Sequence, residues 1–164
     1  MDFKELINTL SKINEELREH SIRAVNTSLT LRNWFFGFYI VEYEQSGNDR
    51  AEYGKALLAK LSQETSILNI SNTEERELRR YRQFYTTYPP IGQLFLQNNQ
   101  KWGLLPEFQI RQSLTANSSI RGLPNPELEI PPQHYLKLFN QISYTHFKEL
   151  IRINDPLKRT FYEI

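Results

Sequence analysis

Apolar residues recur at three- and four-residue spacing through the first part of the chain. They are Phe3, Leu6, Ile7, Leu10, Ile13 and Leu17, with charged residues between them. This spacing gathers the apolar side chains on one side of an α-helix. The pattern predicts an amphipathic helix that packs on the next segment of the chain.

The segment at 28–45, SLTLRNWFFGFYIVEYEQ, is apolar on nearly every side. A helix of this kind belongs at the centre of a bundle. A strand is the competing interpretation, because aromatic and β-branched residues favour strands. The length of the run and the helical pattern on both sides favour a helix.

Two further helices are predicted before residue 97. Turn residues at 46–49 precede a helical pattern over 50–64. Ser71 and Glu74 have the spacing of a capping box, and Pro89 ends the helical pattern after them, which predicts a fourth helix from about Asn72 to Tyr88.

The stretch 98–132 has few charges and contains Pro106, Pro124, Pro126 and Pro131. It predicts a long loop, with a short hairpin as the alternative.

The region 133–164 is helical in pattern again. Ser143 is a candidate N-cap, and Asp155 followed by Pro156 indicates another helix start, so three short helices are expected there. The last of these helices has no glycine, asparagine or proline to end it before Ile164, and we expect the natural protein to continue beyond this residue.

Together these elements predict an all-α fold, a compact helical bundle interrupted by one long loop. The expected organisation is a single domain over 1–164, with a helical core at 1–97, the loop at 98–132 and C-terminal helices at 133–164. The third and fourth helices are also spaced for a helix-turn-helix or winged-helix-like arrangement.

Composition narrows the function. Twenty Lys and Arg face nineteen Asp and Glu, a formal charge of +1, so binding to nucleic acid would need a local basic patch. The chain has no cysteine, which excludes disulfides and thiolate zinc sites and fits a reducing compartment; a cytoplasmic location is the expectation. The longest apolar run is too short to span a bilayer, and no membrane partner is expected.

The predicted fourth helix provides such a patch. At 100° per residue, Leu78, Tyr81, Phe84, Tyr85 and Tyr88 gather on one side, as expected for core residues. The opposite side carries Arg76, Arg79, Arg80 and Gln83, extended by Thr86 and Thr87. Glu74 and Glu77 fall toward the apolar side, so the arginines are expected to lack partners along their own stripe. Arg and Gln read base edges and grip phosphates. The alternative is a solvated face whose arginines pair with carboxylates of neighbouring helices.

A second basic segment lies at 142–156. A short capped helix there would turn Phe147, Leu150 and Ile151 inward and Tyr144, Lys148 and Arg152 outward. Its His146 is expected to make a local hydrogen bond rather than to act in catalysis.

The segments LRNWFFGFYIVEYEQ, RAEYGKALLAKLS, LRRYRQFYTTYP and SYTHFKELIRINDPLKRTFYEI together resemble the N-terminal domain of the YhcG-like nucleases of the PD-(D/E)XK superfamily. The resemblance covers most of 20–97 and 134–164, in the same order. It implies a DNA-binding helical region that precedes a nuclease domain, and that nuclease domain would lie beyond this sequence. By the same resemblance, Arg79, Arg80, Arg82, Gln83 and Tyr85 belong to the family's arginine-rich helix, and His146, Glu149 and Leu150 to a second motif.

The leading hypothesis is a non-catalytic module that binds double-stranded DNA and targets a nuclease. The predicted contacts are Arg76, Arg79, Arg80, Arg82, Gln83, Thr87, Lys148 and Arg152. No cofactor or metal is predicted. The alternative is a protein-interaction or dimerisation module, with a homodimer as candidate partner, in which the aromatic segment Leu31 to Tyr43 or the long loop makes the contact. A free-standing enzyme is disfavoured, because three scattered histidines, His20, His134 and His146, indicate no common pocket.

Overall fold

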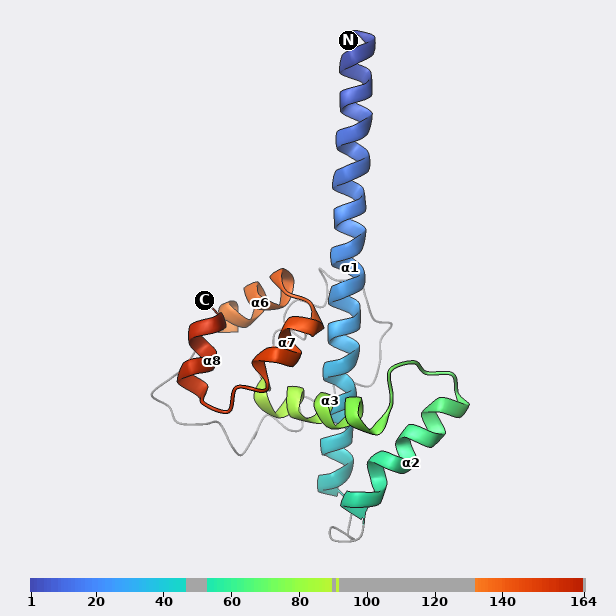
Figure 1. The fold of residues 1–164 in the computed structure, drawn as a ribbon, viewed down its shortest axis with the longest axis vertical. Coiled ribbons are helices and arrows are strands. Elements are labelled where there is room, and N and C mark those ends of the chain that lie inside the picture. Colours follow the sequence, from blue (N-terminus) through green and yellow to red (C-terminus); the bar gives the residue numbers. More distant parts are fainter. Residues whose placement is uncertain (47–52, 90, 92–131, 164) are drawn as a thin grey trace.

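A computed structural model describes residues 1–46, 53–89, 91 and 132–163 (Figure 1). Within these ranges every regular element is a helix, which confirms the all-α prediction. The stretch expected to form the long loop or hairpin falls outside the described residues, apart from Pro132. The helices, in chain order, are α1 (Phe3–Ser46), α2 (Tyr53–Ile67), α3 (Glu75–Thr87), α6 (Pro132–Gln141), α7 (Tyr144–Leu150) and α8 (Pro156–Glu163).

The first two predicted helices are one continuous helix, α1. No glycine or proline lies between Leu17 and Ser28, so nothing in the sequence interrupts the hydrogen-bond ladder there. The expectation that the first amphipathic segment packs on the next one is also wrong. Residues 1–26 are all exposed, and this half of α1 projects from the rest of the molecule as a rod (Figure 1).

The second half of α1 is the centre of the fold, as its all-round apolar character predicts. Leu31, Trp34 and Phe38 are buried, and Trp34 is fully inaccessible. The Trp34 indole N–H donates to the backbone oxygen of Tyr88 at 2.9 Å, at the end of α3. This hydrogen bond satisfies the polar atom of a buried aromatic and fixes where α3 ends against α1.

The helix α3 begins later than predicted. It starts at Glu75 with Glu74 as N-cap, and no side chain caps it. Ser71 therefore makes no capping box. Asn72 has a φ of 59° in the preceding turn, and the Thr73 hydroxyl donates to the backbone oxygen of Ile70, so these residues belong to the turn rather than the helix.

The helices α1 and α3 cross at Gly37. A Cβ atom built on Gly37 would lie 1.9 Å from the backbone oxygen of Tyr81. No side chain fits in that space, so glycine is the residue that allows the two backbones to approach this closely. The crossing sets the depth at which the apolar side of α3, including Leu78, Tyr81 and Phe84, enters the core.

The three C-terminal helices form as predicted; α6 and α7 pack on α1, α7 also packs on α3, and α8 packs on α7. Ser143 is the N-cap of α7, and Asp155 Oδ1 accepts hydrogen bonds from the backbone nitrogens of Leu157 and Lys158 at the start of α8.

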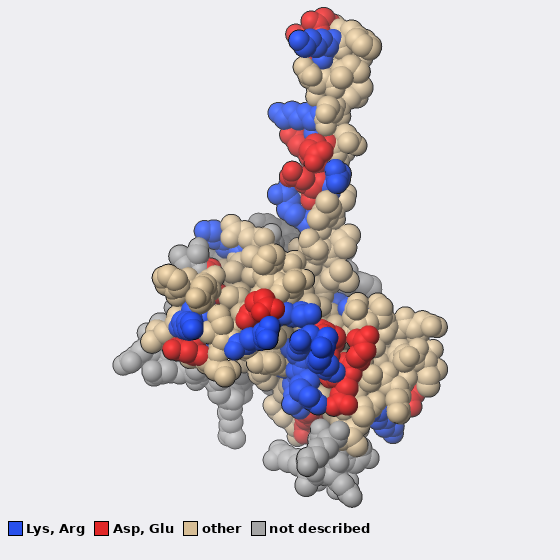
Figure 2. Space-filling model, in the orientation of Figure 1, with Lys and Arg blue, Asp and Glu red and all other residues tan. Residues whose placement is uncertain are grey.

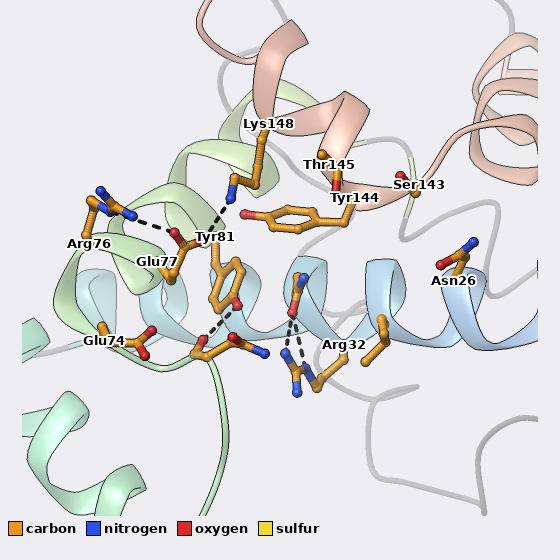
Figure 3. Close-up of a pocket in the computed structure, with 13 residues that line it drawn as sticks. Asn26, Arg32, Glu74, Arg76, Glu77, Tyr81, Ser143, Tyr144, Thr145 and Lys148 are labelled. Atoms are coloured by element: carbon orange, nitrogen blue, oxygen red, sulfur yellow. Dashed lines mark hydrogen bonds and ion pairs between the residues drawn. The ribbon is translucent and has the colours of Figure 1, made fainter. Parts of the chain in front are cut away.

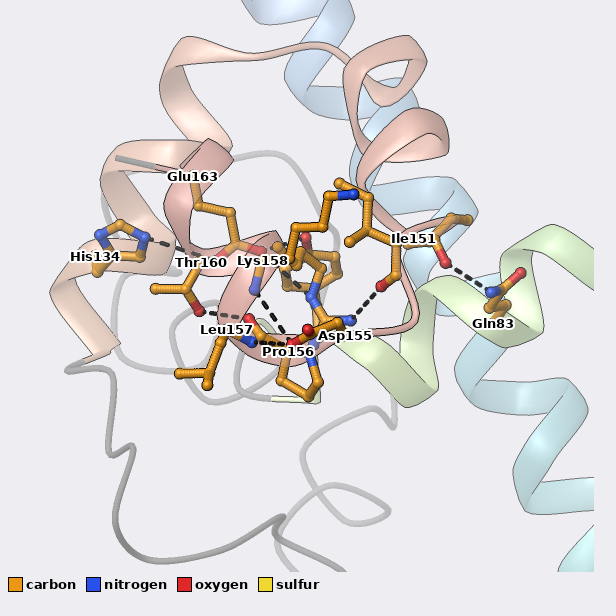
Figure 4. Close-up of polar contacts among 12 residues, drawn as sticks. Gln83, His134, Ile151, Asp155, Pro156, Leu157, Lys158, Thr160 and Glu163 are labelled. Carbon is orange, nitrogen blue, oxygen red and sulfur yellow. Dashed lines mark hydrogen bonds and ion pairs between the residues drawn. The ribbon is translucent and has the colours of Figure 1, made fainter.

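A buried carboxylate joins α8 to α3 and α6. The Tyr88 hydroxyl donates to Glu163 Oε1 at 2.6 Å, Arg159 Nε lies 3.5 Å from the same oxygen, and His134 Nε2 lies 3.9 Å from Glu163 Oε2 (Figure 4). Burial and the nearby carboxylate raise the pKa of Tyr88 well above its ordinary value, so its hydroxyl remains a donor.

Replacing Gly37 with alanine should destabilise the fold by about 2 kcal/mol or more, because the added methyl overpacks the crossing. The sign is diagnostic, since Gly to Ala inside an ordinary helix stabilises by roughly 0.5–1 kcal/mol. Urea unfolding followed by circular dichroism measures the change, with Ser11→Ala on the exposed half of α1 as control. A Gly37→Ala protein as stable as the parent would contradict the close crossing.

Candidate nucleic-acid interface

The predicted basic side of α3 is solvent-facing over its first half. The side chains of Arg76 and Arg79 are 78% and 61% exposed, while Arg80 is 30% exposed. The opposite side of the helix is buried, with Leu78, Tyr81 and Phe84 in the core and Tyr85 half-buried. The helical-wheel assignment is thus confirmed for the apolar side, and the aromatic residues are core rather than base-stacking platforms.

The arginines are not without partners, which corrects the sequence expectation. Arg79 pairs with Glu75 at 2.6 Å, one helical turn earlier, and Arg80 pairs with Glu77. Arg76 Nε lies 3.8 Å from the Glu77 carboxylate. The expectation failed because it omitted Glu75 and placed Glu77 on the apolar side, although residues three or four apart on a helix are neighbours.

The later residues of the predicted site serve internal contacts. Arg82 pairs with Glu44 of α1 at 2.8 Å. The Gln83 amide donates to the backbone oxygen of Ile151 at 2.7 Å, which ties α3 to the end of α7 (Figure 4). Thr87 is half-buried. Arg82 and Gln83 therefore make contacts within the fold, although Gln83 remains exposed overall.

The short helix α7 brings a second group of cations to α3. Lys148 Nζ lies 3.7 Å from Glu77 Oε2, so Glu77 is contacted by Arg76, Arg80 and Lys148 together. Arg152 is 70% exposed and pairs with Glu149. The cations of the two helices thus converge around one carboxylate.

Other features of α7 agree in part with the prediction. Phe147, Leu150 and Ile151 are buried as expected. His146 Nδ1 accepts a hydrogen bond from the Ser143 backbone at 3.3 Å, the local role expected for it. Tyr144, expected to point outward, packs instead against Tyr81 and Phe84.

A cleft of about 640 Å³ lies between α1, α3 and α7 (Figure 3). The residues that line it are mostly of polar type and include Arg32 and Asn33 from α1, Glu77 and Tyr81 from α3, and Lys148 from α7, although their apolar atoms form as much of its surface as their polar atoms. Arg32 donates to Asn33 Oδ1 at 3.0 and 3.1 Å and stacks over Phe36 at 5.4 Å. Arg32 and Asn33 were not among the predicted site residues, although the sequence shows two polar residues directly before the aromatic run.

The Tyr144 hydroxyl faces this cleft region without a hydrogen-bond partner among the described residues, and it is buried. Burial raises the pKa of Tyr144 well above its ordinary value, so the group is a neutral hydroxyl. Tyr81, beside it, donates to the backbone oxygen of Asn72 at 2.7 Å. The two tyrosines therefore differ in whether the hydroxyl is satisfied.

Figure 2 shows the electrostatic character of this face. Lys and Arg side chains gather over α3 and α7, and Asp and Glu side chains lie directly beside them. The patch, defined here as the basic face, consists of Arg76, Arg79, Arg80, Lys148 and Arg152 with their partners Glu75, Glu77 and Glu149. It is a mixed surface with a small excess of positive charge.

The described residues offer few other chemical features. No group of three or more His, Asp or Glu side chains could hold a metal ion in this part of the chain. None of the helices described is long and apolar enough to cross a bilayer. Most of the aromatic segment predicted as a partner surface is buried within the chain, although Tyr39 and Tyr43 are exposed.

Comparison with known proteins identifies the class. A family model described as the DUF1016 N-terminal domain matches residues 9–116, more than half of the chain, and the chain belongs to this family. A curated relative, "Putative nuclease YhcG" of Escherichia coli (strain K12), is 26% identical over 154 residues, which cover 91% of this chain and 36% of that protein. The chain thus spans about a third of that relative's length. The resemblance to the N-terminal domain of YhcG-like proteins is confirmed, and no solved structure matches the chain.

The difference in hydrogen bonding between the Tyr81 and Tyr144 hydroxyls gives a test of the cleft geometry. Tyr144→Phe should leave stability unchanged or raise it by about 1 kcal/mol, because it removes a buried unpaired hydroxyl. Tyr81→Phe should cost about 1 kcal/mol, because it leaves the Asn72 oxygen without its donor. Urea unfolding of both variants measures the contrast, and a larger loss for Tyr144→Phe than for Tyr81→Phe would show that the hydroxyl assignments are wrong.

Proposed function

We propose that this chain is the DNA-binding module of a nuclease-like protein, that it contacts double-stranded DNA through the basic face, and that it has no catalytic role itself. The observation that carries the proposal is the convergence of Arg76, Arg80 and Lys148 on the single carboxylate of Glu77. It gathers cations from two helices around a carboxylate that is itself only 14% exposed, while the Arg76 side chain is 78% exposed. Arg79 and Arg152 add two further exposed cations to the basic face.

The order of the elements supports this role. The helix α2, the turn between Leu68 and Glu74, and α3 succeed one another as in a helix-turn-helix, in which the second helix presents its N-terminal half to DNA. Arg76 and Arg79 occupy that half of α3. The turn is longer than the three or four residues usual for the motif, so we propose phosphate contact first and base contact by Arg76 second.

The ion pairs on the basic face are compatible with DNA binding. The pairs Arg79–Glu75 and Arg152–Glu149 are exposed, and exposed pairs contribute only about 0–1 kcal/mol each. A phosphate can therefore replace the carboxylate partner of Arg79 or Arg152 at small cost, and the released carboxylate returns to water. The same carboxylates lower the local positive potential, so we expect affinity in the range of nonspecific binding, with Kd roughly 10⁻⁴–10⁻⁶ M at physiological salt.

The relative's name includes the word nuclease, and the chain covers only about a third of that protein. We therefore propose that any cleavage activity belongs to the part of the protein outside this sequence. Metal-assisted phosphodiester hydrolysis needs clustered metal-binding groups. The proposed role for this domain is to hold DNA for such a site.

Removing the exposed cations should weaken DNA binding. Fluorescence anisotropy of a labelled duplex at two salt concentrations measures the affinity and its salt slope. The variant Arg76→Ala, Arg79→Ala, Arg152→Ala should bind roughly tenfold more weakly at low salt, with a slope smaller by about 1 for each phosphate that is no longer bound. The control Lys4→Ala, Lys12→Ala, Arg18→Ala removes the same charge from the exposed half of α1 and should bind like the parent. An equal decrease in DNA affinity in both variants would show that only the net charge of the chain matters, and would contradict DNA contact through the basic face.

Neutralising a carboxylate of the basic face should have the opposite effect. Glu75→Gln releases Arg79 from its 2.6 Å ion pair and removes a repulsive charge, so DNA affinity should rise about two- to fivefold, as expected for one surface pair. Glu19→Gln is a matched control, because Glu19 pairs with Arg23 at the same i,i+4 spacing on α1. The same anisotropy assay separates the two, and a Glu75→Gln protein that binds no better than the Glu19→Gln protein would count against phosphate contact by Arg79.

A further inference from the structure

The exposed half of α1, residues 3–26, carries an apolar stripe that nothing in the described part of the chain covers. The stripe consists of Phe3, Leu6, Leu10, Ile13 and Leu17, whose exposed fractions run from 36% to 77%. Single apolar residues on a surface are ordinary, but a contiguous row of large ones along a helix marks an interaction site.

The spacing of the stripe specifies a helical partner. Successive members are three, four, three and four residues apart, which is the a and d pattern of a coiled coil. The alternation continues in phase through His20, Ala24 and Thr27 to Leu31 and Trp34, which are buried in the core. The same seam that packs the domain together at one end of α1 is therefore left open at the other.

Charges beside the stripe are already balanced within the helix. Lys12 pairs with Glu16, Arg18 with Glu15, and Arg23 with Glu19, each three or four residues apart. A partner need not supply opposite charge along this half of α1. It needs only an apolar stripe of the same spacing, which a second copy of the chain provides.

We propose that the free half of α1 is a homodimerisation surface, which pairs antiparallel with the same segment of a second copy. In one antiparallel register, every stripe residue of one copy except Phe3 faces a stripe residue of the other copy. Leu6 faces Leu17 of the other copy, Leu10 faces Ile13, and Phe3 faces His20, and each layer occurs twice by two-fold symmetry. The flanking g positions then place Asp2 opposite Arg23 and Thr9 opposite Glu16, so no like charges meet.

The body of the domain favours this orientation over a parallel one. Thr27 is half-buried, and the first fully buried residues of α1 are Thr30, Leu31, Asn33, Trp34 and Phe35, so the body surrounds α1 on several sides from Thr30 on. A parallel partner helix would run into that body. An antiparallel partner ends beside His20 and carries its own body beyond the opposite end of the rod (Figure 1). The proposal is independent of DNA binding.

Light scattering coupled to size-exclusion chromatography tests the dimer. At tens of micromolar the chain should have twice its mass of 19.6 kDa. The variant Leu10→Glu, Leu17→Glu should be monomeric, and the control Asn8→Glu, Ser11→Glu, on the outer side of the same helix, should remain dimeric. Circular dichroism verifies that each variant keeps a folded body. A monomeric parent, or a stripe variant that remains a dimer, overturns the proposal.

Cysteine cross-linking tests the orientation, and the absence of native cysteine makes it clean. Chains with Leu6→Cys and chains with Leu17→Cys should form little disulfide dimer separately, and should form a mixed disulfide rapidly when combined under mild oxidation. Leu6→Cys mixed with Ser11→Cys, which lies off the stripe, is the control. Efficient self-linking of Leu6→Cys alone would indicate parallel helices and overturn the antiparallel arrangement.

Discussion

The close crossing of α1 and α3 at Gly37 is the constraint on which the rest of the structure depends. Because glycine leaves room for the backbone oxygen of Tyr81, α3 can lie directly against α1. Its apolar side then reaches Trp34 and Phe38, and the Trp34 hydrogen bond to the Tyr88 backbone sets its end. Once α3 is placed, α7 packs on it through Phe147, and α8 is held by the Glu163 carboxylate.

This arrangement also determines which side chains face solvent. A helix with one side fixed in the core must turn its opposite side outward, and on α3 that side carries Arg76 and Arg79. The contact of α7 with α3 brings Lys148 to the same place. The basic face is therefore a consequence of core packing. Its carboxylates keep the excess of positive charge on this face small.

Much of the fold was predictable from apolar periodicity and helix-start signals. The positions of α2, α3 and the three C-terminal helices are indicated by residues such as Leu57, Ser143 and Pro156, because their signals are local. The continuity of α1 was missed, since a change from an amphipathic to a fully apolar pattern suggested two elements. The signal for one helix is the heptad phase, which is unbroken from Phe3 to Phe38.

The candidate site was less predictable, because it depends on hydrogen bonds and ion pairs between residues that are far apart in the sequence. The sequence placed four polar residues on one side of α3 but could not show that Gln83 bonds to Ile151 or that Arg82 reaches Glu44. Those partners lie far away in the chain. The turn of Tyr144 toward the core has the same origin, since only the packed positions of Tyr81 and Phe84 make an inward pocket for it.

We propose that cations of α3 and α7 form one DNA-contacting face. Nuclear magnetic resonance of the arginine side-chain Nε–H groups, recorded while duplex DNA is added, tests it most directly. Signals of Arg76, Arg79 and Arg152 should shift together, while Arg23 on the exposed half of α1 and Arg159, which is paired with Glu163, stay in place. Shifts confined to Arg23 or Arg159, or no shifts at low salt, would show that the basic face does not contact DNA.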